Sequence, residues 1–186
     1  MKICLGIPTN RNVKAKTVLS LLEMVAASSH QFHFVCATEG YTVAENRTYI
    51  VAQAQKANCD FLLFVDDDMT FPPDTLERLL VHKKEIIGVN SHSRMLPLKT
   101  TVELPDGVTE VPKELFEAKA VGAGVLLVDM KIFEKLEKPW FAFETYDFGM
   151  TRMGEDSWFC RQAGRAGYGV WCDPTLEIGH IGDFTF

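Results

Sequence analysis

Three consecutive aspartates, Asp66, Asp67 and Asp68, follow an apolar run at residues 61–65. Such a run is typical of a buried strand, and ligands of open α/β sheets bind at the carboxyl ends of strands. Neighbouring carboxylates repel one another by about 1 kcal/mol per close pair even in water, so this placement costs stability unless a cation or protons compensate. Side chains alternate along an extended chain, so we expect Asp66 and Asp68 to share a side and Asp67 to point away. That pair suits a hard divalent cation which also binds a ligand's phosphates.

The alternative for this segment is a solvated acidic turn that also caps the following helix. Asp74, directly after Pro72 and Pro73, already stands where such a cap is expected. Because Asp74 suits the cap, we favour the metal site for the three aspartates.

Two further carboxylates, Glu155 and Asp156, stand after Gly154 where a later helix is predicted to begin. A carboxylate there serves as a general base or complements the helix dipole. The dipole lowers the pKa of a carboxylate and burial raises it, and the sequence leaves both roles open. His180 adds an imidazole, which suits transition metals; a histidine of the surface or core is the alternative.

Asn46 and Arg47 stand at the predicted start of the second helix, and helix N-termini favour anions. The pair is therefore a candidate for contact with a base or a phosphate. The alternative is that Arg47 pairs with Glu45 or Glu39 on a solvated face.

Pro8, Thr9 and Arg11 end the first predicted strand, where the ligand crevice of such a sheet begins; an ordinary polar turn is the alternative.

The polar loop 91–94 follows the fourth strand and could reach a diphosphate, although a flexible loop is the favoured interpretation. The run 122–124, Gly-Ala-Gly, predicts a close backbone approach beside a ligand, or a bulge.

Composition restricts the class of protein. Of 186 residues, 47% are hydrophobic and 24% charged, which is ordinary for a soluble globular protein. The formal net charge of -6 argues against a general nucleic-acid binder, so a phosphate-bearing ligand would need a metal or placed arginines. Five scattered cysteines indicate reduced core thiols in a cytoplasmic protein. The residues before Pro8 are too few for a secretory signal, and no run approaches the roughly 20 apolar residues of a membrane span.

The first half of the chain alternates strand and helix, which favours an α/β fold with a mostly parallel sheet. Apolar runs predict strands, and helical spacing predicts helices between them. The strands are expected at 2–7, 31–38, 61–65 and 85–90, and the helices at 12–28, 44–57 and 76–82.

The second half is less regular. A turn signal at 105–107 predicts a hairpin between 98–104 and 111–116. A strand at 125–128, short helices at 131–136 and 157–164, and an extended segment at 168–172 follow. No linker divides the chain, so we expect a single domain over 1–186, with a nucleotide-sugar-binding half (1–95) and an acceptor and catalytic half (96–186).

The ordered combination of strand–Asp66-Asp67-Asp68-Met69, Gly-x-Gly before an apolar strand, Gly154-Glu155-Asp156 and Gly179-His180 resembles the GT-A glycosyltransferases, in particular the family 2-like group. The resemblance covers nearly the whole chain and implies a three-layer α/β/α, Rossmann-like fold. It implies that Asp66 and Asp68 form the Asp-x-Asp pair, with Asp68 the direct ligand of Mn²⁺ or Mg²⁺ and His180 joining it. Asp156 matches the base of inverting members, with Glu155 beside it. The nucleotide-contacting positions are Pro8, Thr9, Arg11, Asn46, Arg47, Asp66 and Asp67.

The sequence thus predicts a metal-dependent glycosyltransferase of the hexosyl-transferring type. It would use a UDP- or GDP-sugar donor and an acceptor that the sequence does not name. A nucleotidyltransferase acting on a sugar phosphate is one alternative, although residues 9–12 lack the glycine of its usual phosphate loop. A non-catalytic nucleotide-sugar-binding partner protein is another, and assembly into a homo-oligomer stays open.

Overall fold

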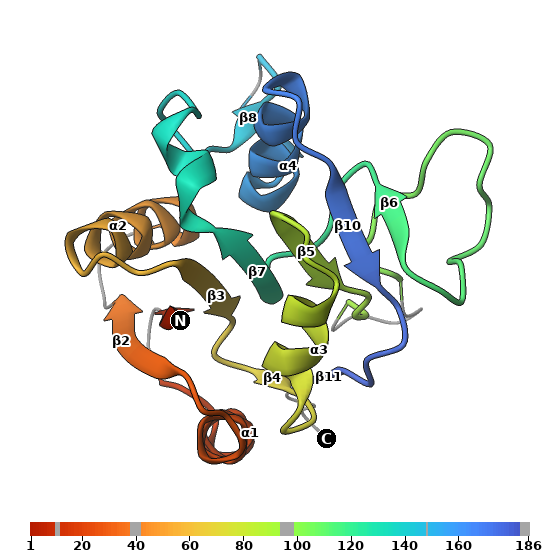
Figure 1. The fold of residues 1–186 in the computed structure, drawn as a ribbon. Helices are drawn as coiled ribbons and strands as arrows, with labels where there is room; N and C mark the ends of the chain where they lie inside the picture. Colours follow the sequence, from red (N-terminus) through yellow and green to blue (C-terminus); the bar gives the residue numbers. More distant parts are fainter. Residues whose placement is uncertain (10–11, 38–41, 94–98, 148, 183–186) are drawn as a thin grey trace.

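A computed structural model describes residues 1–9, 12–37, 42–93, 99–147 and 149–182. A seven-stranded sheet with the order β2-β1-β3-β7-β5-β10-β6 forms its centre (Figure 1). Five strands run in one direction, while β7 and β6 run against them. The bounds are β1 Lys2–Pro8, β2 Gln31–Ala37, β3 Phe61–Val65, β5 Ile86–Val89, β6 Phe116–Ala118, β7 Val125–Asp129 and β10 Val170–Asp173. The predicted α/β class with a mostly parallel sheet is therefore confirmed.

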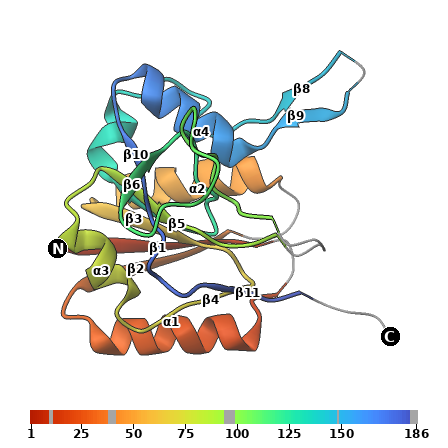
Figure 2. The same ribbon diagram turned by 90° about the vertical axis from the view of Figure 1, so that its right-hand side faces the viewer.

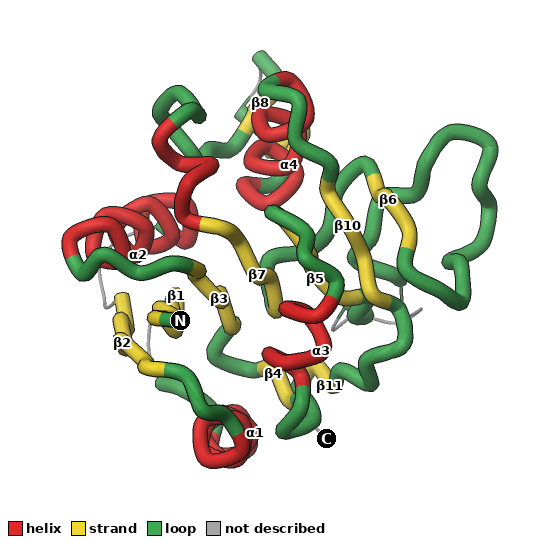
Figure 3. Tube along the Cα trace, in the orientation of Figure 1, coloured by secondary structure: helices red, strands yellow, loops and turns green. Residues whose placement is uncertain are grey.

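Helices cover both faces of the sheet, which gives three layers (Figures 1 and 3). On one face, α1 (Ala15–Ala27) and α3 (Thr75–Val81) pack into a core with the odd-numbered side chains of β1. On the other, α2 (Val43–Lys56), the short 3-10 helix η1 (Met130–Glu134) and α4 (Glu155–Arg165) enclose the second core. Strand β1 contributes side chains to both cores because its apolar run is continuous rather than alternating, as expected for a strand buried on both faces.

Helix α2 begins at a capping box. The side chain of Thr42 accepts a hydrogen bond from the Glu45 amide, and the Glu45 carboxylate accepts one from the Thr42 amide. Glu45 thus bonds to the start of its own helix and does not pair with Arg47, and Glu39, the other partner considered for Arg47, lies outside the described residues. The box fixes where the helix begins and so where the side chains of its first turns lie.

Two pairs of short strands lie outside the central sheet. Strand β4 (Met69–Thr70) pairs antiparallel with β11 (Gly179–His180), which brings the last described segment back beside the aspartates. Strands β8 (Glu144–Thr145) and β9 (Thr151–Met153) form a hairpin that projects from the body of the molecule (Figure 2). Neither pairing was predicted, because segments this short carry no detectable periodicity.

The predicted hairpin between 98–104 and 111–116 is wrong. Its turn exists, since the Val108 amide donates to the Pro105 carbonyl and Gly107 has a φ of 80°. However, Glu103 bridges to Ala120, and β6 pairs with β10 instead. Edge positions on a larger sheet bury more surface than an isolated two-stranded hairpin does, and such hairpins are marginal in water.

Two smaller expectations also fail. Asp74 occupies the N-cap position of α3, but its side chain makes no capping hydrogen bond. Cys36 is exposed, because β2 is the edge strand of the sheet, whereas the other four cysteines are buried and all five are free thiols. In the described part of the chain, no helix has both the length and the apolar composition needed to cross a bilayer.

Candidate active site

A pocket of about 390 Å³ lies at the carboxyl ends of β1 and β3. Its wall contains most of the residues that the sequence singled out, although they come from positions up to 147 residues apart in the chain. The lining consists of Pro8, Thr9, Val43, Asn46, Arg47, Asp66, Asp67, Asp68 and Glu155. Asp156 and His180 are not part of this lining, and Arg11 lies outside the described residues. Val43 is the one lining residue that the sequence did not indicate, since an apolar side chain at a helix start carries no chemical signal.

The three aspartates form a turn rather than an extension of β3. The Met69 amide donates to the Asp66 carbonyl at 3.3 Å, so the expected alternation, with Asp67 facing away, is wrong. All three side chains line the pocket and each has a different partner: Asp66 pairs with Arg47, Asp67 accepts a hydrogen bond from Thr9, and Asp68 contacts His180. The turn directs the carboxylates apart, which reduces the repulsion expected for adjacent charges.

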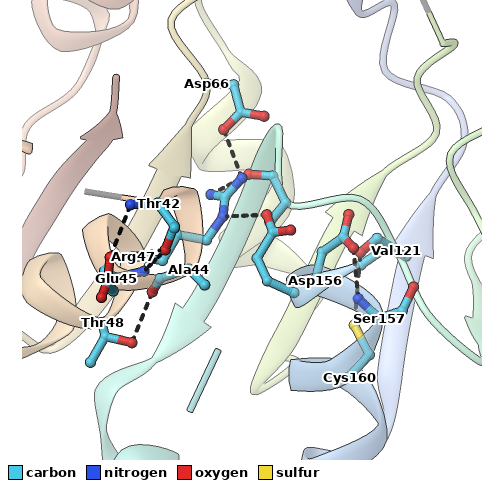
Figure 4. A network of polar contacts seen from close by, with 12 residues as sticks. Thr42, Ala44, Glu45, Arg47, Thr48, Asp66, Val121, Asp156, Ser157 and Cys160 are labelled. Carbon is cyan, nitrogen blue, oxygen red and sulfur yellow. Dashed lines mark hydrogen bonds and ion pairs between the residues drawn. The ribbon is translucent and has the colours of Figure 1, made fainter. Parts of the chain in front are cut away.

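Arg47 joins three parts of the fold from a nearly inaccessible position, with 2% of its surface exposed. Its Nη2 lies 2.8 Å from Asp66 Oδ1, its Nε 3.2 Å from Glu155 Oε1, and its Nη1 donates to the Ala123 carbonyl at 3.2 Å. The guanidinium also lies over the ring of Phe64, 5.3 Å from its centroid. Figure 4 shows the guanidinium reaching from α2 to Asp66. The sequence did not reveal this network, because its members are 19, 76 and 108 residues from Arg47.

Burial controls the ionisation of this network. Although 31% of the Asp66 side chain faces the pocket, burial raises its pKa and outweighs the opposing effect of Arg47. Burial likewise raises the pKa of Glu155 against the effect of Arg47. For Arg47 itself burial favours a lower pKa, but Asp66 and Glu155 raise it above its ordinary value. The guanidinium is therefore charged and committed to two carboxylates, which makes it a structural anchor of the pocket wall.

His180 is held at both ring nitrogens. Its Nδ1 lies 2.8 Å from the His92 carbonyl, and its Nε2 lies 3.2 Å from Asp68 Oδ1. A carbonyl oxygen only accepts hydrogen bonds, so Nδ1 must carry the proton of this contact. The arrangement presents Nε2 toward the carboxylate, and a carbonyl partner on the far nitrogen is the usual support of a metal-binding histidine. The pairing of β4 with β11 creates this contact, together with the Ile181 amide, which donates to the Asp68 carbonyl at 2.8 Å.

The donor set fits a divalent cation through Asp68 and His180. Asp66 is engaged by Arg47, and no three acidic, histidine or cysteine side chains of the described residues converge as a complete metal-binding group. A protein that binds magnesium or manganese together with a nucleotide usually supplies one or two ligands, while phosphate oxygens and water supply the rest. The pocket wall holds four carboxylates and one guanidinium, so an anionic ligand would need a cation to offset this negative charge.

The start of α4 places its two carboxylates differently. Glu155 is buried, lines the pocket and pairs with Arg47. Asp156 is half-buried and accepts a hydrogen bond from the Ser157 amide at 2.7 Å (Figure 4). Gly154 before them leaves room for this arrangement, because a Cβ there would lie 2.8 Å from Asp156 Oδ1. Glu155 is thus part of the anchor, whereas Asp156 accepts its hydrogen bond from a backbone amide.

Thr9 and Asn46, two further predicted residues, join the end of β1 to the start of α2. The Asn46 side chain donates to the Thr9 carbonyl at 3.3 Å, and the Thr9 amide donates to the Ala37 carbonyl at 3.2 Å. Asn46 and Thr9 are both buried, at 1% and 6% exposure. They therefore set the distance between α2 and the end of β1. The Asp66 amide donates to the Gly124 carbonyl at 2.9 Å, so the run 122–124 lies against the aspartate turn, and its predicted approach to a ligand stays a prediction.

A larger hollow of about 670 Å³ lies at the other end of β3, around Asp60 and Asp129. Both carboxylates accept hydrogen bonds from backbone amides, Asp60 from Lys2 at 2.8 Å and Asp129 from Lys131 at 2.9 Å. These two hydrogen bonds fix local chain segments. We therefore assign the site to the smaller pocket, where the polar groups converge.

Comparison with known proteins supports the fold. No protein-family model and no curated protein matches the chain in sequence. The structure of A197 from STIV matches with a TM-score of 0.69 at 18% identity, covering 98% of this chain and 87% of that one. GalNAc-T7 with UDP, GalNAc and Mn²⁺ matches with a TM-score of 0.56 at 14% identity, over 97% of this chain and 43% of that one. CMP:2-keto-3-deoxy-manno-octonic acid synthetase complexed with CTP matches with a TM-score of 0.51 at 12% identity, over 94% and 90%.

Identities this low establish the fold and nothing finer. The three-layer α/β fold has GT-A-like nucleotide-sugar transferases among its structural neighbours, as the sequence motifs indicated. GalNAc-T7 and CMP:2-keto-3-deoxy-manno-octonic acid synthetase both share it, so the fold alone assigns no reaction.

Proposed function

We propose that this chain is a metal-dependent glycosyltransferase that transfers a sugar, of hexose type, from a UDP- or GDP-sugar to an acceptor hydroxyl. The observation that carries the proposal is the pocket at the carboxyl ends of β1 and β3, with its aspartate turn and the Asp68–His180 contact. Ligands of open α/β sheets bind at this edge. A neighbour of the same fold was solved with UDP, GalNAc and Mn²⁺, which supports the ligand class.

In this proposal the donor's nucleoside occupies the wall formed by Pro8, Thr9 and Asn46, and its diphosphate faces the aspartate turn. Asp68 and His180 hold Mn²⁺ or Mg²⁺, with Asp66 and Asp67 next to them. Arg47 contributes indirectly, because it neutralises Asp66 and joins it to α4. Arg11, predicted to contact the nucleotide, belongs to the segment outside the described residues.

The chemistry assigned to the site is displacement at the anomeric carbon. The bound cation would neutralise charge that develops on the departing diphosphate. Asp156 takes the proton of the acceptor hydroxyl while the hydroxyl oxygen bonds to the anomeric carbon and the bond to the diphosphate oxygen breaks. Attack from the opposite face inverts the anomeric configuration. The hydrogen bond from the Ser157 amide would hold the Asp156 carboxylate in place for this step.

A nucleotidyltransferase is the second candidate, and the match to CMP:2-keto-3-deoxy-manno-octonic acid synthetase over 90% of that chain favours keeping it. In that enzyme class an oxygen of the sugar substrate attacks the α-phosphate of a nucleoside triphosphate, and pyrophosphate is released. The same metal and aspartates would serve both reactions, so the products decide between them.

The discriminating experiment incubates the pure chain with a panel of nucleotide sugars and Mn²⁺ or Mg²⁺, and separately with sugar phosphates and nucleoside triphosphates. Release of nucleoside diphosphate from a sugar nucleotide, by transfer or by slow donor hydrolysis, supports the proposal. Inorganic pyrophosphate from the second mixture supports the nucleotidyltransferase. Binding of nucleotide sugars without turnover of either kind would instead indicate a non-catalytic binding protein.

A further inference from the structure

Helix α1 exposes an apolar stripe on its outer face. The helix buries Thr17, Ser20, Leu21 and Met24 against the sheet. On the opposite side, Leu19 and Leu22 are 57% and 60% exposed and Val18 is 39% exposed. Ala15 and Ala26 are also exposed and continue the same face at helical spacing. We refer to these five residues as the α1 stripe.

The stripe departs from what surface helices ordinarily show, which is a polar outer face. Its three large side chains expose apolar surface on the order of 300 Å² per molecule, comparable to the largest apolar patch of a typical monomer, which is often functional. Phe34 of β2, the edge strand, is 58% exposed, and its ring contacts that of Phe32, with 6.2 Å between the centroids. Phe32 packs into the same core as the buried face of α1.

The charges on α1 are of opposite sign and lie beside the stripe. Within Ala15–Ala27 the charged side chains are Lys16 and Glu23, and both are exposed. Seven residues separate them, which is close to two helical turns, so they lie on the same flank of the stripe. Their midpoint lies between Leu19 and Ser20, beside the most exposed leucines.

We propose that a second copy of this chain docks on the α1 stripe, with the two α1 helices antiparallel about a twofold axis at that midpoint. A twofold perpendicular to both helices keeps the charged flanks on one side of the pair. It brings Lys16 of one copy beside Glu23 of the other, and the symmetry repeats the contact. The leucines of the two copies then cover one another between these ion pairs. An isologous contact of this kind needs one self-complementary patch, and α1 provides it.

The proposed dimer is independent of the proposed reaction and leaves its pocket open. Thr17, on the buried face of α1, donates to the Asp67 carbonyl at 3.2 Å, so the stripe faces away from the aspartate turn. The patch is smaller than the roughly 800 Å² per partner of standard complexes, so association should be weak and dependent on concentration.

Charge reversal provides the test, because the geometry predicts a result that few other contacts would give. Lys16→Glu alone creates two repulsive pairs of glutamates in the dimer, and Glu23→Lys alone creates two pairs of lysines. Each variant should dimerise about tenfold more weakly than wild type, since two attractive pairs become repulsive. An equimolar mixture of the two variants restores both opposite-charge pairs, so a heterodimer should form with wild-type affinity.

Sedimentation equilibrium up to millimolar concentration measures these affinities, with Leu19→Glu as the variant that disrupts the apolar contact. Lys113→Glu, at an exposed site away from α1, is the matched control and should dimerise like wild type. Circular dichroism checks that each variant is folded. A monomeric wild type, or a dimer indifferent to Leu19→Glu, would overturn the proposal and leave the stripe to another partner or a membrane surface. A dimer that the mixture fails to restore would overturn the antiparallel pairing.

Discussion

Replacement of Arg47 by methionine tests whether this residue anchors the pocket wall. The change keeps an apolar stem over Phe64 but leaves Asp66 and Glu155 without the cation between them. Breaking a buried ion pair by removing one partner costs about 3–5 kcal/mol, because a charge stays buried without compensation. Asp66 is partly exposed to the pocket, so we expect about 3 kcal/mol here, a large part of the roughly 5–15 kcal/mol that stabilises a typical domain.

Urea unfolding of wild type and Arg47→Met measures this loss. The exposed pair of Arg152 and Glu144, 3.3 Å apart, offers a matched control: Arg152→Met should cost less than about 1 kcal/mol. The double variant Arg47→Met/Glu155→Gln should regain part of the lost stability, since one of the two uncompensated charges is gone. Coupling of this kind is expected for residues in direct contact.

The effect of pH provides a second readout. Burial raises the folded-state pKa of Asp66 and of Glu155, and removal of Arg47 raises both further. A carboxyl whose pKa is higher in the folded state than in the unfolded state destabilises the fold at high pH. This destabilisation disappears as the pH falls through the folded-state pKa and the carboxyl is protonated. The penalty of Arg47→Met should therefore shrink on acidification from neutral pH. A penalty below about 1 kcal/mol, or one independent of pH, would refute the anchoring role.

Three further predictions concern catalysis, acid stability and packing. Asp156→Asn should lower turnover by about 10²-fold or more while costing no more than about 1 kcal/mol of unfolding free energy; a variant with most of its turnover would make Asp156 structural and favour a retaining mechanism. Burial opposes the ionisation of Asp173, but hydrogen bonds from Thr175 and His82 outweigh it and lower its pKa. The contribution of Asp173 to the free energy of unfolding is present above the unfolded-state pKa of about 3.9 and should be lost as the pH falls through the lower folded-state pKa. Urea unfolding below pH 4 should therefore show a smaller loss of stability in Asp173→Asn than in wild type. Gly6→Ala should cost about 1–3 kcal/mol in thermal unfolding, because its Cβ would clash with Ile50, whereas Gly164→Ala, with nothing near its Cβ, should be stabilising.

The elements of the first half were predictable because each has a strong local pattern. Strands β1 and β3 are continuous apolar runs, and α2 repeats its apolar residues at helical spacing. The position of the aspartates at a strand's carboxyl end then followed from the sheet's topology. The pairings that the sequence did not predict depend on contacts distant in sequence. The partner of 99–104 depends on competition between strands, and the pairing of β4 with β11 joins segments 110 residues apart.

Many of the residues that meet at the pocket were predictable from the sequence, but their partners were not. Residue types and helix starts indicated Thr9, Asn46 and Arg47, and the pocket contains all three. The engagement of Arg47 by Asp66 and Glu155 depends on side-chain directions after folding. The sequence likewise predicted an extended segment at the three aspartates, whereas the structure has a turn from Asp66 to Met69. In this turn each carboxylate reaches a partner of its own.

In the proposed function, the aspartate pocket binds a nucleoside diphosphate through a cation. Calorimetric titration of UDP and of GDP, each with Mn²⁺, into wild type, Asp68→Asn and Asp129→Asn tests it most directly. Asp129 lies in the hollow at the other end of β3, so its variant controls for a general loss of negative charge. We predict that one of the two nucleotides binds wild type and Asp129→Asn equally, and that Asp68→Asn weakens this binding by about tenfold or more, in line with the loss of a metal ligand. Binding that is absent from wild type, or that is unchanged in Asp68→Asn, would contradict the account.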